Sequence, residues 1–179
     1  VRIVQGIAPS FGGINLEDIA APRCFEIERR LKATMDIPVM HDDQHGTAVV
    51  LLAALRNALK VVNRRLEDVR VVVNGLGAAG RACSRMLLAA GCGHLTGVGR
   101  QGIILTVTPD RLQACHEDIA NGLHEDAPTG ILQDALAGAD VFIGLSVGNI
   151  LTAQDLDLMA SDRIVFAMAN PDPEVPPAV

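Results

Sequence analysis

The chain has 179 residues, of which 49% are hydrophobic and 20% are charged. This length is enough for one full domain and part of another. The formal net charge of −6 disfavours nucleic acid and anionic membranes as partners. No apolar run reaches the length of a membrane span, so we expect no membrane partner.

The four cysteines show no C-x-x-C spacing, which is typical of reduced, mostly buried thiols in a cytoplasmic protein. The sequence begins at Val1 rather than Met, and we expect it to be a piece of a longer polypeptide. Its first apolar run, residues 1–8, is predicted to form a short strand.

Residues 22–47 are predicted to form a helix, a strand and a polar loop. Pro22 is a favoured first residue for a helix that runs to about residue 33. Residues 37–40 are predicted to form a short strand, and residues 41–47 a loop. The long helix that follows, starting at Gly46 or Thr47, is apolar on most faces and should be well buried.

The centre of the chain carries the clearest motif. Residues 69–73 form a valine-rich run that predicts a buried parallel strand. Gly75, Gly77 and Gly80 follow in the order G-x-G-x-x-G, and residues 78–88 read as a helix rich in Ala and Leu. Strand, glycine turn and helix in this order predict dinucleotide binding, and a glycine turn in an unrelated α/β protein is the alternative.

Each glycine has a separate expected role in that motif. Gly75 permits the tight turn, Gly77 lets the backbone approach a pyrophosphate, and Gly80 lets helix and strand pack closely. The helix start supplies free N–H groups and a partial positive charge for the phosphates. The residues expected to contact the cofactor are Asn74, Gly75, Gly77, Ala78, Ala79, Gly80, Arg100 and Ser146.

Strands and helices continue to alternate to the end of the chain. The predicted strands cover residues 94–98, 140–144 and 163–169, and the predicted helices cover residues 108–121, 131–137 and 152–159. This alternation predicts an α/β fold with a doubly wound parallel sheet, a Rossmann-type NAD(P)-binding domain. We expect part of a second α/β domain over residues 1–45 and the Rossmann-type domain over residues 46–179.

Two acidic pairs, Glu17-Asp18 and Asp42-Asp43, each lie near the end of a short apolar stretch. Carboxylate oxygens are ligands of Mg²⁺ and Mn²⁺, so the pairs are able to converge on one ion, although acidic pairs are usually solvated surface charge. His41 and His45 are four residues apart, as in some zinc sites, but polar positions near a helix start are the simpler interpretation.

Ser146 and Asn170 each follow a predicted parallel strand. Ligands of open α/β sheets bind at that carboxyl edge, although ordinary turn residues also occur there. Ser146 has no adjacent arrangement of His and Asp, which disfavours a nucleophilic role.

Five segments together resemble the malic enzymes of bacterial type, and they occur in the order found in that family. They are FGGINLEDIAAPRCFEIE (residues 11–28), VMHDDQHGTA (39–48), NGLGAAG (74–80), GADVFIGLS (138–146) and FAMANPDPE (166–174). The resemblance covers nearly the whole chain. The acidic segments and ANPDPE are the most specific parts, whereas many dehydrogenases share the glycine motif. The resemblance implies the end of a metal-bearing domain followed by most of a cofactor domain.

Malic enzymes oxidise and decarboxylate malate to pyruvate and CO₂ with NAD or NADP and with Mg²⁺ or Mn²⁺. The resemblance therefore implies this reaction, with malate and pyruvate as small-molecule partners and a homodimer or higher homo-oligomer. The site residues that it implies are the metal ligands Glu17, Asp18 and Asp43, the supporting Asp42, and Thr47 and Asn170 near the substrate and nicotinamide.

The sequence departs from that family in its acid–base residues. Malic enzymes use a Tyr and a Lys that lie in an N-terminal region. This chain contains no Tyr, and its lysines, Lys32 and Lys60, lie outside the family's lysine motif. We therefore expect that the chain alone does not turn over malate. The alternative to a segment of an active malic enzyme is a non-catalytic NAD(P)-binding module or an inactive remnant.

A second departure concerns the choice of cofactor. In NAD-binding folds an acidic residue about twenty positions beyond the glycines bonds the adenosine ribose. Gly99 stands there in this chain, and Arg100 follows it. A glycine leaves room for the 2′-phosphate of NADP, and a guanidinium suits phosphate. We expect NADP to be preferred over NAD, and an Arg100 that points to solvent is the alternative.

Overall fold

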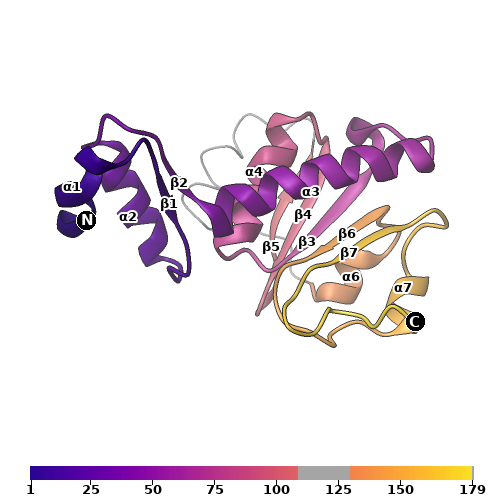
Figure 1. Ribbon diagram of the computed structural model, residues 1–179. Coiled ribbons are helices and arrows are strands. Elements are labelled where there is room, and N and C mark those ends of the chain that lie inside the picture. The colour runs from indigo at the N-terminus through magenta and orange to yellow at the C-terminus, as the bar shows by residue number, and fades with distance from the viewer. Residues whose placement is uncertain (109–129, 179) are drawn as a thin grey trace.

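The computed structural model describes residues 1–108 and 130–178 (Figure 1). The helix predicted over residues 108–121 lies outside the described residues, apart from its first residue. The elements follow in the order α1 (Arg2–Ile7), η1 (Ala8–Ser10), β1 (Ile14–Leu16), α2 (Arg23–Lys32), β2 (Val39–His41), α3 (Asp42–Val61), η2 (Leu66–Asp68), β3 (Arg70–Asn74), α4 (Ala78–Ala89), β4 (His94–Gly99), β5 (Gly102–Val107), α6 (Leu132–Leu136), β6 (Val141–Gly144), α7 (Ala153–Asp157) and β7 (Ile164–Ala167).

The N-terminal part contains α1, α2 and a small parallel sheet of β1 and β2. Three buried side chains form its centre, namely Leu16, Leu31 and Val39. The strand predicted over residues 1–8 is wrong, because residues 2–7 form the helix α1 and Ala8 begins η1. Val1 and Val4, which are three residues apart, lie on one face of this turn of helix and pack against the centre.

Helix α3 begins at Asp42 rather than at Gly46 or Thr47, so the prediction of a loop over residues 41–47 is wrong. Asp42 and Asp43 occupy the first turn, where the partial positive charge of the helix start stabilises carboxylates. Gly46 suits the second turn, because a Cβ there would overlap the Asp42 side chain.

Helix α3 is also less buried than its composition predicts. Val49, Val50 and Val61 are exposed, whereas Leu51 and Leu55 belong to the core. The helix packs against α4 along one side, so only a stripe of its surface is covered, as in ordinary amphipathic helices. Neither α3 nor any other described helix combines the length and apolarity that crossing a membrane requires.

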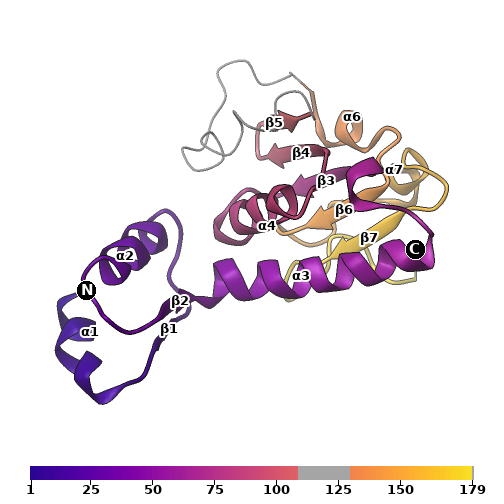
Figure 2. The same cartoon turned by 90° about the horizontal axis from the view of Figure 1, so that it is seen from above.

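The main sheet has five strands in the order β5-β4-β3-β6-β7, which lie side by side in Figure 2. Strand β3 pairs in parallel with both β4 and β6, and β6 pairs in parallel with β7. The predicted α/β class with a Rossmann-type parallel sheet is confirmed, and the edge strand β5 differs by running antiparallel to β4. The strand order reverses between β3 and β6, which is where ligands bind in such sheets.

Helices cover both faces of this sheet (Figure 1). Val71 and Val73 of β3 pack with Leu55 of α3 in one core cluster, on the side of α3 and α4. Val72 packs with Phe142 in a second cluster, on the side of α6 and α7. Neighbouring residues of a strand point to opposite faces, so burial of β3 on both faces explains its continuous valine run.

The remaining described strands and helices lie close to their predicted positions. The strands predicted over residues 94–98, 140–144 and 163–169 are confirmed as β4, β6 and β7. The helix predicted after Thr152 is confirmed as α7, and the Thr152 side chain accepts a hydrogen bond from the Asp155 backbone N–H, as a helix cap should.

Candidate functional site

The glycine motif forms the turn between β3 and α4. Gly75 has a φ of +101°, a left-handed conformation that glycine adopts without strain, and a Cβ there would lie 2.6 Å from the Leu145 carbonyl oxygen. A Cβ on Gly80 would overlap the carbonyl oxygen of Gly75. Gly77 has open space where a Cβ would project. Packing therefore requires glycine at the first and third positions, and the second position leaves room for a ligand.

A cleft of about 600 Å³ opens beside this turn. It lies at the carboxyl ends of β3, β4 and β6, where open α/β sheets bind ligands. Five of the predicted cofactor residues line it, namely Asn74, Gly75, Gly77, Arg100 and Ser146. Ala78, Ala79 and Gly80 are not among its lining residues and form the first turn of α4.

Hydrogen bonds from three chain segments hold the cleft together. Asn74 Nδ2 donates to Ser146 Oγ at 2.9 Å. The carboxylate of Glu174, which is fully buried, accepts hydrogen bonds from the backbone N–H groups of Ser146 at 3.2 Å and Ala169 at 3.0 Å. Glu174 thus joins the loops after β6 and β7. Sequence reasoning missed this residue, and its place in the ANPDPE segment was the only signal.

Two of the predicted substrate or nicotinamide residues lie away from the lining of the cleft. Thr47 is partly buried in α3, and Asn170 is exposed after β7. Neither residue lines the cleft itself.

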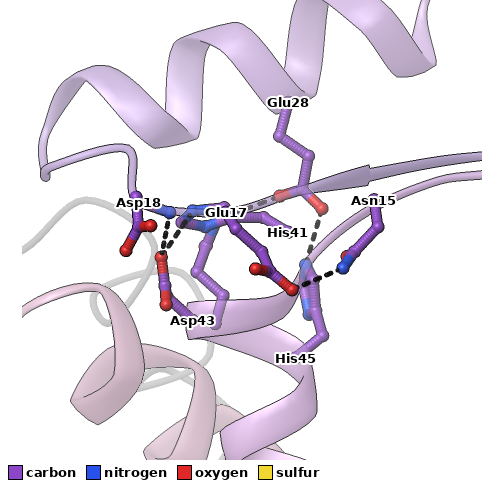
Figure 3. Close-up of polar contacts among 8 residues, drawn as sticks. Asn15, Glu17, Asp18, Glu28, His41, Asp43 and His45 are labelled. Atoms are coloured by element: carbon purple, nitrogen blue, oxygen red, sulfur yellow. Dashed lines mark hydrogen bonds and ion pairs between the residues drawn. The ribbon is translucent and has the colours of Figure 1, made fainter.

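The parallel pairing of β1 and β2 brings the acidic pairs Glu17-Asp18 and Asp42-Asp43 to one edge, where Figure 3 shows Glu17, Asp18 and Asp43. Asp18 has a φ of +55°, and its backbone N–H donates to Asp43 Oδ2 at 3.1 Å. Glu17 Oε1 instead accepts from Asn15 Nδ2 at 2.9 Å. In residues 1–108 and 130–178, no three His, Cys, Asp or Glu side chains are grouped to hold a metal ion. Two of the three predicted metal ligands therefore face one another, and the third has a different partner.

An open depression of about 370 Å³ adjoins this acidic edge, and Asp18, Asp43 and Ala78 border it. Ala78 directly follows Gly77, which lines the large cleft. Consecutive residues of the glycine motif therefore border the two hollows. The Arg81 guanidinium also lies 5.3 Å from the centre of the Phe25 ring, so α4 contacts α2 here.

A buried polar network centred on Glu28 of α2 lies behind the acidic edge. Glu28 accepts a hydrogen bond from Gln44 Nε2 at 3.2 Å and lies 2.7 Å from both His45 Nε2 and Lys32 Nζ. Burial alone would raise the pKa of the Glu28 carboxyl, but the hydrogen bond from Lys32 and the charges of His45 and Lys32 hold this pKa below its usual value. Glu28 is therefore an ionised carboxylate at neutral pH.

The fully buried His41 extends this network toward Asp43. His41 Nδ1 lies 2.9 Å from Gln44 Nε2, and His41 Nε2 lies 3.1 Å from Asp43 Oδ2. The second contact has the length of a hydrogen bond but not its alignment, because Nε2 has no well-directed partner in the described part of the chain. His41 and His45 turn to different partners, so the geometry offers no support for a shared zinc ion.

The described cysteines are structural. Cys24, Cys83 and Cys92 are free and buried. Burial raises the pKa of Cys83 to about 12 and that of Cys92 to about 11. Such thiols stay protonated at neutral pH and are poor nucleophiles.

Comparison with known proteins identifies relatives of this arrangement. No protein-family model matches the chain. The NAD-dependent malic enzyme of Geobacillus stearothermophilus is 57% identical over 99% of this chain and 37% of its own length. The NADP-dependent malic enzyme of Halomonas elongata is 46% identical over 99% of this chain and 41% of its own length. The chain thus spans less than half the length of these relatives.

A solved structure shows the same relationship in three dimensions. The NAD-dependent malic enzyme of Thermotoga maritima is 48% identical and superimposes with a TM-score of 0.86, over 99% of this chain and 47% of that one. The resemblance expected from the five sequence segments is confirmed by this match. By sequence and by fold, the chain is homologous to the malic enzymes and corresponds to a segment of them.

Proposed function

We propose that residues 1–179 form the metal- and nucleotide-binding segment of a malic enzyme, which converts malate to pyruvate and CO₂ with reduction of NAD(P). The observation that carries this proposal is that consecutive residues, Gly77 and Ala78, border the nucleotide cleft and the hollow at the acidic edge. A hydride acceptor in the cleft and a divalent ion at the edge would both reach one small substrate. The relatives named above support the proposal, because all three are malic enzymes.

The proposed metal ligands are Asp18, Asp43 and Glu17, and Asp42 supports them from the first turn of α3. Their carboxylate oxygens are the donors that Mg²⁺ and Mn²⁺ prefer. Glu17 joins the facing pair when it leaves Asn15, and the exposure of both side chains allows this movement. A divalent ion held there supplies a Lewis acid for the oxidation and decarboxylation of a 2-hydroxy acid.

The proposed nucleotide is NADP, with NAD as the alternative. Gly99 and Arg100 both line the cleft that the glycine turn borders, so the guanidinium is available to a 2′-phosphate. The relatives include one NAD-dependent and one NADP-dependent enzyme and therefore support either cofactor. We propose that Thr47 and Asn170 approach the nicotinamide or substrate once these are bound.

Calorimetric titration with Mn²⁺ tests the metal site in the full polypeptide that carries residues 1–179. We expect Asp43→Ala to abolish the binding signal, because it removes a ligand and the acceptor of the Asp18 N–H. Asp36→Ala is the control, since Asp36 is an exposed aspartate of the same N-terminal part. Unchanged Mn²⁺ affinity in Asp43→Ala would contradict the assignment.

The second candidate function is a non-catalytic NAD(P)-binding module. The absence of Tyr from the sequence favours it, and so do the positions of the lysines. Lys32 Nζ is paired with Glu28, and Lys60 Nζ donates to Asn57 at the far end of α3. An assay of malate-dependent NAD(P)H formation separates the two functions. The full polypeptide should turn over and the 179-residue chain should not, because each proton-transfer group commonly contributes about 10²–10⁴-fold.

The division of the chain is part of the same proposal. Residues 1–45 would be the end of a metal-bearing domain and residues 46–179 an NAD(P)-binding domain, and helix α3 runs across this boundary. Homo-oligomerisation and a cytoplasmic location stay predictions, which light scattering and cell fractionation can test.

A further inference from the structure

His41 lies between the acidic edge and the network around Glu28 (Figure 3). Its Nδ1 atom faces Gln44 Nε2 at 2.9 Å, and its Nε2 atom faces Asp43 Oδ2 at 3.1 Å. A neutral imidazole has one ring proton, so one nitrogen donates and the other accepts. The position of this proton decides how His41 acts on Asp43.

Glu28 fixes the orientation of the Gln44 amide. An ionised carboxylate only accepts hydrogen bonds, and Glu28 is kept in this form by Lys32 and His45. The Gln44 group that lies 3.2 Å from Glu28 Oε2 is therefore the NH₂ group, because the amide oxygen would place two acceptors against each other. The second hydrogen of the same NH₂ group is directed at His41 Nδ1.

This orientation in turn fixes the tautomer of His41. Nδ1 must accept from Gln44, so the ring proton lies on Nε2 and faces Asp43 Oδ2. The Asp43 side chain is 47% exposed, so a rotation that brings Oδ2 into line with this proton displaces no core residue. The backbone N–H of Asp18 already donates to the same oxygen at 3.1 Å, and within residues 1–108 and 130–178 Asp43 Oδ1 has no hydrogen-bond partner.

We propose that Glu28, Gln44 and His41 form a positioning relay, which holds Asp43 by Oδ2 and presents Oδ1 to the divalent ion. The metal role of Asp43 rests on the proposed function, whereas the order of hydrogen bonds in the relay does not. The three relay residues do not touch the ion and act through Asp43. Loss of such an outer partner typically lowers metal affinity by about 10- to 100-fold.

Exchange of the first two relay side chains, Glu28→Gln together with Gln44→Glu, tests the order of hydrogen bonds. The buried contact keeps one amide and one carboxylate, but the carboxylate now faces His41 Nδ1. Because a carboxylate only accepts, the ring proton is expected to move to Nδ1. The readout is ¹⁵N NMR of the histidine ring nitrogens at neutral pH in the full polypeptide. The His41 signals are identified by their loss in His41→Gln.

Glu26→Gln, at an exposed glutamate of the same helix, is the matched control, because it exchanges a carboxylate for an amide outside the relay. We expect a protonated Nε2 and an unprotonated Nδ1 in the wild type and in this control, and a protonated Nδ1 in the exchanged pair. The same protonation pattern in all three proteins would overturn the relay. We also expect Mn²⁺ to bind about 10- to 100-fold more weakly to the exchanged pair than to the control. A moved proton with equal Mn²⁺ affinities would overturn the positioning role of His41.

Failure of the proposed function has a different signature. If the wild type binds no Mn²⁺ but the ring proton moves as expected, the metal role of Asp43 is wrong and the hydrogen-bond order stands. If the wild type binds Mn²⁺ and the ring proton does not move, the relay is wrong and the metal site stands.

Discussion

The nucleotide cleft and the acidic edge are built in different ways. The cleft is shaped by the glycine turn at the ends of strands whose centre, β3, is buried on both faces. The acidic edge is made of side chains at the end of β1 and the start of α3, held by contacts such as that from the Asp18 N–H to Asp43. The small core behind it contains Leu16, Leu31 and Val39.

The two sites should therefore differ in how substitutions change stability and ligand binding. Overlap with backbone atoms is not relieved by rotating a side chain, so changes at Gly75 and Gly80 should lower stability and ligand binding together. Side chains at the acidic edge are partly exposed and able to change rotamer. Changes there should therefore alter ligand affinity and pH response more than the free energy of unfolding.

The largest effect is expected for Gly80→Ala, which acts on the backbone contact that shapes the cleft. The new Cβ would overlap the carbonyl oxygen of Gly75. Overpacking of this kind costs about 1–3 kcal/mol, and more where backbone must move. Urea unfolding and titration with NADPH should show lower stability and weaker binding.

Gly77→Ala is the control for the Gly80→Ala prediction. A Cβ at Gly77 meets no neighbouring atom, so unfolding should stay within about 0.5 kcal/mol of wild type. The methyl group would occupy the space in front of the turn, so NADPH should still bind more weakly. Equal losses of stability in the two variants would contradict the contrast between packing and ligand positions.

Glu174→Gln is expected to have the next largest effect, because it changes a buried side chain that ties together two loops of the cleft. The carboxylate accepts from the backbone N–H groups of Ser146 and Ala169. A glutamine has one accepting oxygen, and its NH₂ group would face the other N–H. The loss should be about 1–3 kcal/mol in urea unfolding. Glu67→Gln, at an exposed glutamate, should stay near wild type, and a similar loss in both variants would rule out this role of Glu174.

The cleft was largely predictable from sequence because its parts are local. The valine run makes a strand buried on both faces, and Gly75 and Gly80 are the positions where backbone approaches too closely for a side chain. Glu174 was not predicted, because its contact with Ser146 is not local. This contact joins residues 28 positions apart, and no periodic pattern marks such a contact.

The acidic edge was predictable in composition but not in geometry. The resemblance gave Glu17, Asp18 and Asp43, yet the start of α3 at Asp42 was missed because Gly46 suggested a loop. The relay depends on a side-chain contact between α2 and α3, which joins Glu28 and Gln44 across 16 positions. Only the three-dimensional structure shows this contact.

An effect of similar size, on ligand affinity rather than on unfolding, is expected for cofactor choice, which depends on a side chain at the rim of the cleft. In the wild type we expect NADP to bind about 10- to 100-fold more tightly than NAD, because a charge-assisted hydrogen bond contributes about 1.5–3 kcal/mol. Gly99→Asp with Arg100→Ser should remove this preference. The aspartate is tolerated because its Cβ would meet only the end of the Ile104 side chain, at 3.0 Å. Arg85→Ser, at an exposed residue of α4, should leave the preference unchanged. If the double variant keeps the wild-type ratio of NADP affinity to NAD affinity, residues other than Gly99 and Arg100 determine the choice of cofactor.

The smallest effect is expected in the acid response of the N-terminal part, where Glu28 is the group concerned. Its pKa in the folded chain is lower than in the unfolded chain, because the hydrogen bond and charge of Lys32 and the charge of His45 outweigh burial. A carboxyl with a lowered folded pKa stabilises the fold above its unfolded pKa, which is about 4.3 for Glu. That stabilisation is lost as the pH falls through the folded pKa.

Urea unfolding at neutral pH and at steps below about pH 4.3 should therefore show a shallower decline of stability in Glu28→Gln than in wild type, since the amide does not titrate. Glu26→Gln is the control on the same helix. Glu26 is an exposed partner of Arg29, and exposed ion pairs contribute little to stability, so this variant should follow the wild-type curve. If Glu28→Gln also follows that curve, the carboxylate of Glu28 does not stabilise the N-terminal part. The acidic edge would then depend on its small apolar core more than on the polar network behind it.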